Sequence, residues 1–157
     1  MKEKKPITRS ENMRRVKSKD TKPEIFLRKL LWHRGFRYRL NYSKLPGSPD
    51  LYISKYQVAV FVNGCFWHMH ESCKLSSIPK NNHEFWEKKL RGNTERDRKN
   101  YKLLESMGIK VIVVWGCEIK MMMKDEKALE NKMDQIVGEI ISHDPPKSIE
   151  TGNPDLK

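Results

Sequence analysis

Residues 48–73, SPDLYISKYQVAVFVNGCFWHMHESC, bring together three kinds of side chain that could do chemistry. Asp50 precedes an apolar run, at a point where a carboxylate can hold a hard cation such as Mg²⁺. Two histidines follow the run, and a neutral imidazole can accept a proton from water near pH 7. The stretch ends in soft metal ligands and an aromatic pair: Cys65, Phe66, Trp67, His68, His70 and Cys73.

The cysteines predict a structural zinc site. The spacing Cys65-x4-His70-x2-Cys73 gives three ligands, and Cys117, just beyond a second apolar run, gives the fourth. Structural zinc prefers four tetrahedral Cys or His ligands, and this set uses all three cysteines of the chain. His68 competes with His70 for the ligand role, since both are near. The alternative is three unrelated thiols, two of them small core residues.

The hydrophobic pattern predicts which elements position these residues. Thr21-Lys-Pro-Glu24 is a capping box in which Glu24 would bond back to the Thr21 N–H, and Gly35 would end the helix. Apolar runs and periods predict strands at 36–40, 50–53, 57–62 and 109–115, and further helices at 83–108 and 125–141. The run at 57–62 has no polar face and should be a central strand of the sheet. Residues 64–82 look irregular. Gly92 could break or bend the helix expected at 83–108. A helix between two buried strands implies a parallel crossover, and therefore a mixed sheet flanked by helices.

Charge is distributed unevenly along the chain. The net charge is +12, and residues 1–40 carry 14 Lys and Arg against 4 Asp and Glu, with aromatic residues between them. This balance indicates a nucleic-acid partner rather than a membrane, the alternative being a solvated basic tail. We expect a basic DNA-binding arm at 1–20, one domain at 21–142 and a disordered tail at 143–157. With no membrane-length apolar run and no secretory signal, the expected location is cytoplasmic, where an odd number of cysteines favours a metal site over disulfides.

Several motifs resemble those of the very short patch repair (Vsr-type) DNA mismatch endonucleases, which nick one strand beside a T:G mismatch. The matching stretches keep the family's order over about residues 8–118: TRSENMRRVKSKDT, LPGSPD, GCFWH, FWEKKLRGNTERDRKN and VIVVWGC. GCFWH after an apolar strand, with NTERDR downstream, is a specific signature. The resemblance implies an α/β, restriction-endonuclease-like fold: a mixed β-sheet flanked by helices, with a zinc-stabilised loop.

The same resemblance implies a catalytic role for four residues. Asp50 would bind Mg²⁺, with the backbone carbonyl of Val62 as a second ligand. His68 would be the general base, and Glu24 a further active-site carboxylate. From the sequence alone, Glu24 is better explained as a helix cap and Asp50 could cap a turn. Phosphodiester hydrolysis does need an activated water and neutralisation of developing charge, which these residue types can provide.

On the DNA side, the resemblance assigns a wedge and two readers of the mismatch. Phe66 and Trp67 would enter between base pairs, with Met13 entering from the other groove, and Lys89 and Asn93 would contact the mismatched bases. Aromatic side chains are core residues by default, but the polar, metal-tied loop makes burial of this pair less expected. Lys89 could equally be a solvated helix charge.

Two positions depart from the family pattern. Asn63 stands where the family has a second histidine, and two residues rather than one separate His70 from Cys73. An asparagine can hydrogen-bond but cannot carry a proton or a positive charge. We therefore predict that Asn63 either lowers activity or only orients a metal-bound water.

Together these features predict a Mg²⁺-dependent endonuclease that nicks one strand of double-stranded DNA at or next to a T:G mismatch. One alternative is a nickase of the same fold with a different target, in restriction or defence. Another is a catalytically weak, zinc-stabilised protein that binds distorted DNA. A monomer is expected because a mismatch is asymmetric, and other repair proteins are candidate further partners.

Overall fold

The computed structural model describes residues 6–8, 10–11 and 20–143. Within these ranges the chain forms a four-stranded sheet of order β1-β2-β3-β4. Antiparallel pairing joins the first three strands and parallel pairing joins the last two. The strands are β1 (Arg39–Leu40), β2 (Leu51–Ile53), β3 (Val58–Asn63) and β4 (Lys110–Trp115). The predicted mixed sheet is confirmed, and so is the central position of the fully apolar run, which forms β3.

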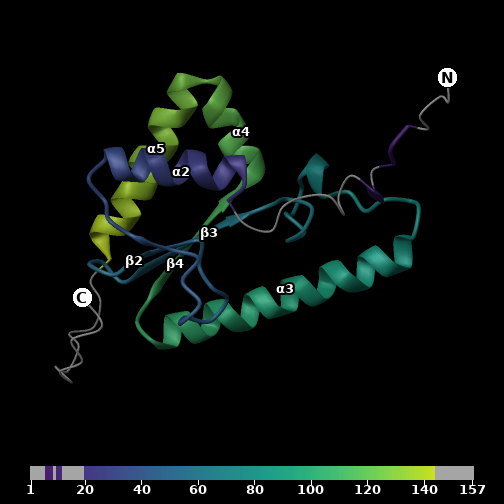
Figure 1. The fold of residues 1–157 in the computed structure, drawn as a ribbon, viewed down its shortest axis with the longest axis horizontal. Coiled ribbons are helices and arrows are strands. Elements are labelled where there is room, and N and C mark those ends of the chain that lie inside the picture. The colour runs from purple at the N-terminus through teal and green to yellow at the C-terminus, as the bar shows by residue number, and fades with distance from the viewer. Residues whose placement is uncertain (1–5, 9, 12–19, 144–157) are drawn as a thin grey trace.

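Helices cover both faces of this sheet (Figure 1). Three helices lie on one face: α2 (Lys22–His33), α4 (Gly116–Lys124) and α5 (Glu126–Ser142). They enclose the main core with side chains such as Leu27, Ile119 and Met133, all fully buried. On the other face, α3 (His83–Ser106) packs through Leu104 against Ala59 and Phe61 of β3.

Helix α3 is the crossover between the two parallel strands β3 and β4. It runs without interruption past Gly92, so the predicted break at that glycine is wrong. Among the described residues, a Cβ at Gly92 would meet nothing within 4 Å. The amino-terminal half of α3 extends beyond the sheet in Figure 1 and supports the loop at 64–82.

One predicted element is shorter in the structure, and one observed helix was not predicted. The strand expected at 36–40 is reduced to Arg39–Leu40, because Phe36 turns into the main core. Helix α4 was not predicted, and it begins directly at the end of β4 with Trp115 at its N-cap. A tryptophan is not a sequence signal for a helix start, and only the Trp115 N–H donating to Glu118 Oε2 at 3.2 Å marks it.

The ends of the chain are described only in part. Residues 1–5, 9, 12–19 and 144–157 lie outside the described residues, so the predictions for Met13, most of the basic arm and the tail fall there. Ser10 is described, and its hydroxyl accepts a hydrogen bond of 2.7 Å from the buried Trp86 indole of α3. His143, expected to open the tail, instead bonds the Tyr56 carbonyl at 2.9 Å. Among the described residues, no helix is both long enough and apolar enough to cross a membrane.

Candidate active site and metal centre

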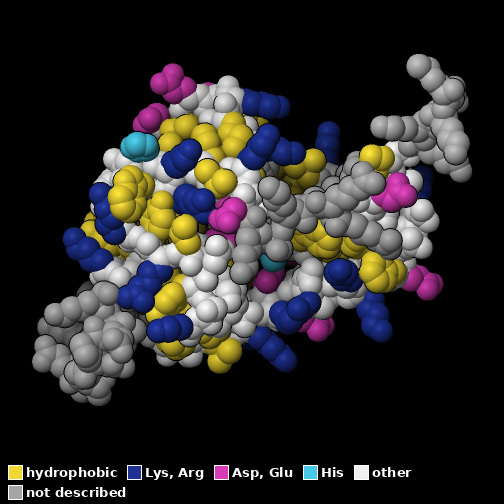
Figure 2. Space-filling model, in the orientation of Figure 1, with side chains coloured by type: hydrophobic (Ala, Val, Ile, Leu, Met, Phe, Trp, Pro, Cys, Tyr) yellow, Lys and Arg dark blue, Asp and Glu magenta, His cyan; other side chains and the backbone are white. Residues whose placement is uncertain are grey.

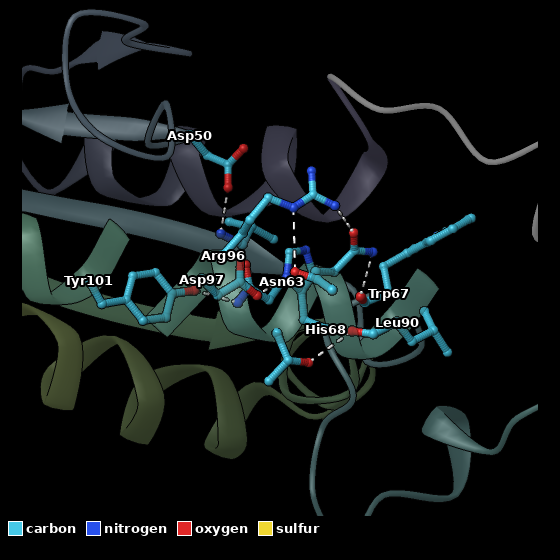
Figure 3. Close-up of polar contacts among 12 residues, drawn as sticks. Asp50, Asn63, Trp67, His68, Leu90, Arg96, Asp97 and Tyr101 are labelled. Carbon is cyan, nitrogen blue, oxygen red and sulfur yellow. Dashed lines mark hydrogen bonds and ion pairs between the residues drawn. The ribbon is translucent and has the colours of Figure 1, made fainter. Parts of the chain in front are cut away.

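Asp50 lies where the β2–β3 ladder ends. Leu51 pairs with Val60, so the next N–H along that edge of β3 has no strand partner. The Asp50 carboxylate takes its place and accepts from the Val62 N–H at 2.7 Å (Figure 3). Because the N–H and C=O of one residue point to the same edge of a strand, the Val62 carbonyl faces the Asp50 side as well.

The turn before Asp50 needs its glycine. Gly47 has φ +76°, and a Cβ there would lie 3.1 Å from Asn100 Cβ and 3.3 Å from the Phe61 ring. A side chain would therefore be strained by both backbone and neighbours. The tight LPGSPD turn thus brings the chain back against α3 and forms one wall of a cavity of about 300 Å³.

This cavity collects the predicted catalytic residues. Its lining includes both carboxylates and the histidine predicted from the sequence, together with residues at the end of β3 and one from α3: Glu24, Asp50, Val62, Asn63, His68 and Asp97. They come from α2, from the turn before β2, from β3, from the loop after it, and from α3. Residues far apart in the sequence therefore meet at one end of the sheet.

Glu24 combines the two roles that the sequence left open. The Thr21 hydroxyl accepts from the Glu24 N–H at 3.5 Å, as the capping box requires. The Glu24 carboxylate, however, accepts from the Asp20 N–H at 2.9 Å and not from Thr21, so this half of the prediction is wrong. The side chain is 8% exposed and lines the cavity, and burial raises its pKa.

Burial also raises the pKa of Asp50, from the ordinary 3.8 to about 6. The Val62 N–H and the nearby His68 work against this rise, and the Glu24 carboxylate adds to it. At neutral pH the carboxylate is ionised at a cost, because it is poorly solvated and lies beside a second negative charge. A cation between the two carboxylates would relieve both effects.

We expect Asp50→Asn to stabilise the fold at high pH. The folded pKa exceeds the unfolded one, so ionisation lowers the free energy of unfolding as pH rises from about 4 to about 6, and that loss persists above. Without added Mg²⁺ the variant should gain on the order of 3 kcal/mol at pH 8 and little at pH 4. Denaturant unfolding at both pH values measures this, with the exposed Asp134→Asn as the matched control. An equal gain at pH 4 and pH 8 would contradict the role of ionisation.

His68 is held by a partner that the sequence analysis did not identify. Its Nδ1 lies 2.6 Å from Asp97 Oδ2 on α3, and both side chains are about three-quarters buried, at 28% and 23% exposed. A neutral imidazole that donates from Nδ1 keeps its lone pair on Nε2. The pair therefore fixes the ring and its tautomer, leaving one nitrogen as a proton acceptor. Asp97 lies in the NTERDR stretch, which was noted only as a motif.

The four predicted zinc ligands meet in space. One ligand atom from each of Cys65, His70, Cys73 and Cys117 lies within 4.8 Å of the others. His70 stacks flat on Trp115 at 4.1 Å, and the Cys117 N–H donates to Cys65 Sγ at 3.4 Å. The structure therefore places His70, and not His68, in the cysteine cluster, whereas His68 lines the cavity. A Cys₃His set of this kind can hold a metal such as zinc.

The loop that carries these ligands also has a small apolar cluster of its own. Phe66, Trp86 and Leu90 are buried together, with Trp67 packed beside them. Phe66 is only 4% exposed, so the expectation that burial of the aromatic pair is disfavoured is wrong for this residue. Trp67 is half-buried and lies edge-to-face with Trp86 at 5.7 Å. Of the two aromatics, Trp67 is the one accessible in the protein without DNA.

The predicted readers of the mismatch lie on α3 beside Trp67. The Lys89 ammonium is 5.6 Å from the Trp67 ring centre, and Asn93 Nδ2 donates to the Trp67 carbonyl at 3.2 Å. Arg96 then donates to Asn93 Oδ1 at 2.6 Å (Figure 3). One helix face therefore fixes the loop and presents cationic groups next to the aromatic ring. Figure 2 shows Lys and Arg side chains spread over this side of the molecule.

Comparison with known proteins identifies the family. The model of the family described as DNA mismatch endonuclease Vsr matches residues 2–75. Type II nicking enzyme V.NmeAIP of Neisseria meningitidis is 46% identical over 132 residues, 84% of this chain and 91% of the relative. The DNA mismatch endonuclease Vsr of Escherichia coli K12 is 39% identical over 134 residues, 84% of this chain and 85% of the relative.

The chain belongs to the Vsr family of DNA mismatch endonucleases. A third relative, type II nicking enzyme V.XorIIP of Xanthomonas oryzae, is 38% identical over 129 residues, 82% of this chain and 94% of the relative. The resemblance stated from the motifs is confirmed, and so is the mixed α/β fold that it implied. Membership places the chain among DNA endonucleases, which are hydrolases that act on DNA.

Proposed function

We propose that this Vsr-family chain nicks one strand of DNA at or next to a T:G mismatch, by Mg²⁺-dependent hydrolysis of a phosphodiester. The observation that supports it most is the cavity in which Asp50, Glu24 and the His68–Asp97 pair meet, directly beside the Trp67 loop. One end of the sheet thus combines a candidate hydrolytic site with a loop that could unstack the bases of the DNA double helix. A protein that only bound DNA would not need the hydrolytic part.

The donor set of the cavity fits a magnesium ion. Mg²⁺ prefers oxygen ligands, and Asp50 has one carboxylate oxygen beyond the one that accepts from Val62. The Val62 carbonyl lies on the same edge, and Glu24 adds negative charge. When bound there, the ion would supply charge neutralisation at the phosphate. We assign Asp50 and the Val62 carbonyl as its protein ligands.

Within the protein, His68 is the proposed general base. Its Nε2 accepts a proton from the attacking water, while the Asp97 carboxylate holds Nδ1–H and stabilises the charge that develops on the ring. Asp97 acts through His68 and is a positioning residue. Asp97 lies on α3, and zinc bound at the Cys₃His cluster would hold the loop that carries His68.

The Cys₃His cluster fits zinc as a structural ion. Three cysteines and one histidine, with no acidic side chain grouped with them among the described residues, match a closed tetrahedral site. Bound zinc would join the 64–82 loop to the start of α4, since Cys117 is the second residue of that helix. We therefore assign zinc to stability and Mg²⁺ to catalysis.

DNA binding is assigned to the wedge and the adjacent α3 face. Trp67 would enter between base pairs, with Phe66 beneath it, Met13 from the arm, and Lys89 and Asn93 at the mismatched bases. Aromatic wedges unstack and kink DNA at a cost of a few kcal/mol per step. That cost is smaller at a mispaired step, which gives a physical reason for mismatch preference. Because Phe66 is buried, its participation would require the loop to rearrange on DNA.

Trp67→Ala should weaken binding to T:G DNA more than binding to matched DNA. A lost base-stacking contact costs about 1–3 kcal/mol, or roughly 5- to 150-fold in affinity. Affinities for both duplexes, measured in EDTA, give the comparison. Trp32→Ala is the matched control, since Trp32 is 48% exposed on α2 away from the loop. Equal losses on the two duplexes would show that Trp67 serves only the structure of the loop.

A second candidate function is nicking at a different target. It is favoured by relatives whose names state only a nicking activity. Incubation of a T:G duplex and the same duplex with T:A, in Mg²⁺ or in EDTA, distinguishes the two. We expect nicks only in the T:G duplex with Mg²⁺. Nicks in both duplexes would favour the second candidate, and binding without nicks would favour a DNA-binding module. We further propose a cytoplasmic monomer that acts on double-stranded DNA, with other repair proteins as candidate further partners.

A further inference from the structure

Asn63, which the sequence predicts either to lower activity or to orient a metal-bound water, forms a pair with Tyr101. Asn63 is the last residue of β3, is 4% exposed, and donates from Nδ2 to the Tyr101 hydroxyl of α3 at 2.9 Å (Figure 3). The Tyr101 ring is fixed by an edge-to-face contact with Phe61 at 5.0 Å. The phenol is therefore a rigid acceptor placed at the end of the strand.

The contact decides which way the amide faces. An asparagine side chain has one donor end and one acceptor end, so committing Nδ2 to Tyr101 directs Oδ1 to the other side. Asn63 lines the cavity of Asp50 and His68, and also the adjoining hollow of about 400 Å³ that Tyr101 lines. Asn63, His68 and Asp97 line both the catalytic cavity and the adjoining hollow, so they form the boundary between them.

The pair carries no charge at neutral pH. Burial raises the pKa of Tyr101 to about 12, the Asn63 bond opposes this, and the carboxylates of Asp97 and Asp50 add to it. The hydroxyl thus keeps its proton and stays an acceptor for Asn63 through one of its lone pairs. Neither residue can take over the proton from water, so any contribution must be orientation.

We propose that Tyr101 is a positioning residue that holds the Asn63 amide with its carbonyl oxygen toward the catalytic cavity, where it accepts a hydrogen bond from the attacking water. The inference rests on the proposed nuclease function and adds a second fixed acceptor to it. Water held between Asn63 Oδ1 and His68 Nε2 has one proton directed to each. That constraint favours a single orientation of the nucleophile over rotation in the cavity.

The test is a double-mutant cycle in single-turnover nicking of a T:G duplex at saturating zinc-loaded protein. Tyr101→Phe keeps the ring and removes the acceptor, and should slow nicking about 3- to 10-fold, the equivalent of one neutral hydrogen bond. Asn63→Leu should slow it at least as much, and the double variant should be no slower than Asn63→Leu alone. Tyr38→Phe is the control, because its hydroxyl donates to the Arg28 carbonyl elsewhere. DNA affinity should be unchanged in all four.

Additive losses in the cycle, or no loss in Tyr101→Phe, would overturn the inference. The second measurement is the NMR signal of the Asn63 side-chain amide, which should shift and exchange faster with water in Tyr101→Phe. If the unmodified protein nicks no duplex, the proposed function fails. The NMR signal of the Asn63 amide then decides by itself whether Tyr101 positions Asn63. An unchanged Asn63 signal would then overturn the positioning role.

Discussion

Asp50→Asn should reduce the single-turnover nicking rate at least about a thousandfold while leaving DNA affinity within about threefold. The substitution keeps the shape and removes the charge that would hold Mg²⁺. Loss of metal-assisted charge stabilisation costs several kcal/mol at the transition state, and each 1.36 kcal/mol is tenfold in rate. Nicking of a T:G duplex and binding of the same duplex in EDTA give the two quantities.

The pH profile supplies an independent check on the same residue. Burial raises the pKa of Asp50 to about 6, so nicking should fall as pH drops through this value, where the protonated carboxyl no longer holds a cation. Raising the Mg²⁺ concentration should move the midpoint to lower pH, because cation and proton compete for one carboxylate. Exposed Asp134→Asn should keep both rate and profile. Unimpaired nicking by Asp50→Asn would contradict the assignment.

Loss of the zinc cluster should have the second large effect. We expect one tightly bound Zn²⁺ per chain. Cys117→Ser should lower the zinc content, and it should lower the free energy of unfolding by roughly 3 kcal/mol or more. The reason is that Cys117 lies 52 positions after Cys65, so the ion would cross-link the loop to α4. Metal analysis and denaturant unfolding of the purified protein measure both quantities.

A histidine pair gives the matched control for the zinc site. His70→Ala should lower zinc content, whereas His83→Ala should not, because His83 is about half exposed at the start of α3 and outside the cluster. Purified protein without zinc, or full stability in Cys117→Ser, would contradict a structural metal. Equal effects of the two histidine variants would do the same.

The sequence predicted the strands and the soft-ligand set better than it predicted side-chain partners. Period and apolar runs report burial, which is why β3 was placed as the central strand. The number and spacing of the cysteines indicated four candidate metal ligands, and the structure places these four side chains close together. Helix α4 was not predicted because it follows β4 directly and has a tryptophan, not a typical capping residue, at its N-cap. Such elements depend on tertiary packing, here of Ile119 and Met122 in the core.

Partners across long sequence distances were beyond what local patterns can show. Asp97 is 29 positions from His68, and Tyr101 is 38 positions from Asn63. Nothing in the type or spacing of these residues predicts the contacts. A helical period does place Asp97 and Tyr101 on one face of α3, four residues apart. If the predicted helix is packed with that face against the end of β3, Asp97 and Tyr101 become candidate partners of the residues there.

The proposed metal site gives a reason for Asp50, which is expected to destabilise the fold at the end of the sheet. Asp50 is ionised at neutral pH in a poorly solvated position beside Glu24, and its neutral replacement is expected to be more stable. Functional sites commonly keep such groups at a cost to stability. The opposite signs expected for Asp50→Asn, higher stability and lost nicking, distinguish a catalytic carboxylate from one that merely caps Val62.

Strand-resolved cleavage of one duplex is the sharpest test of the proposed mismatch-dependent nicking. The duplex carries a single T:G pair and a different label on each strand, and is incubated with the zinc-loaded protein and Mg²⁺. The proposed function predicts one product, a nick at or next to the mismatch in a single strand, absent in EDTA and absent when the pair is T:A. Cleavage of both strands, cleavage independent of the mismatch, or no cleavage with tight binding would contradict it.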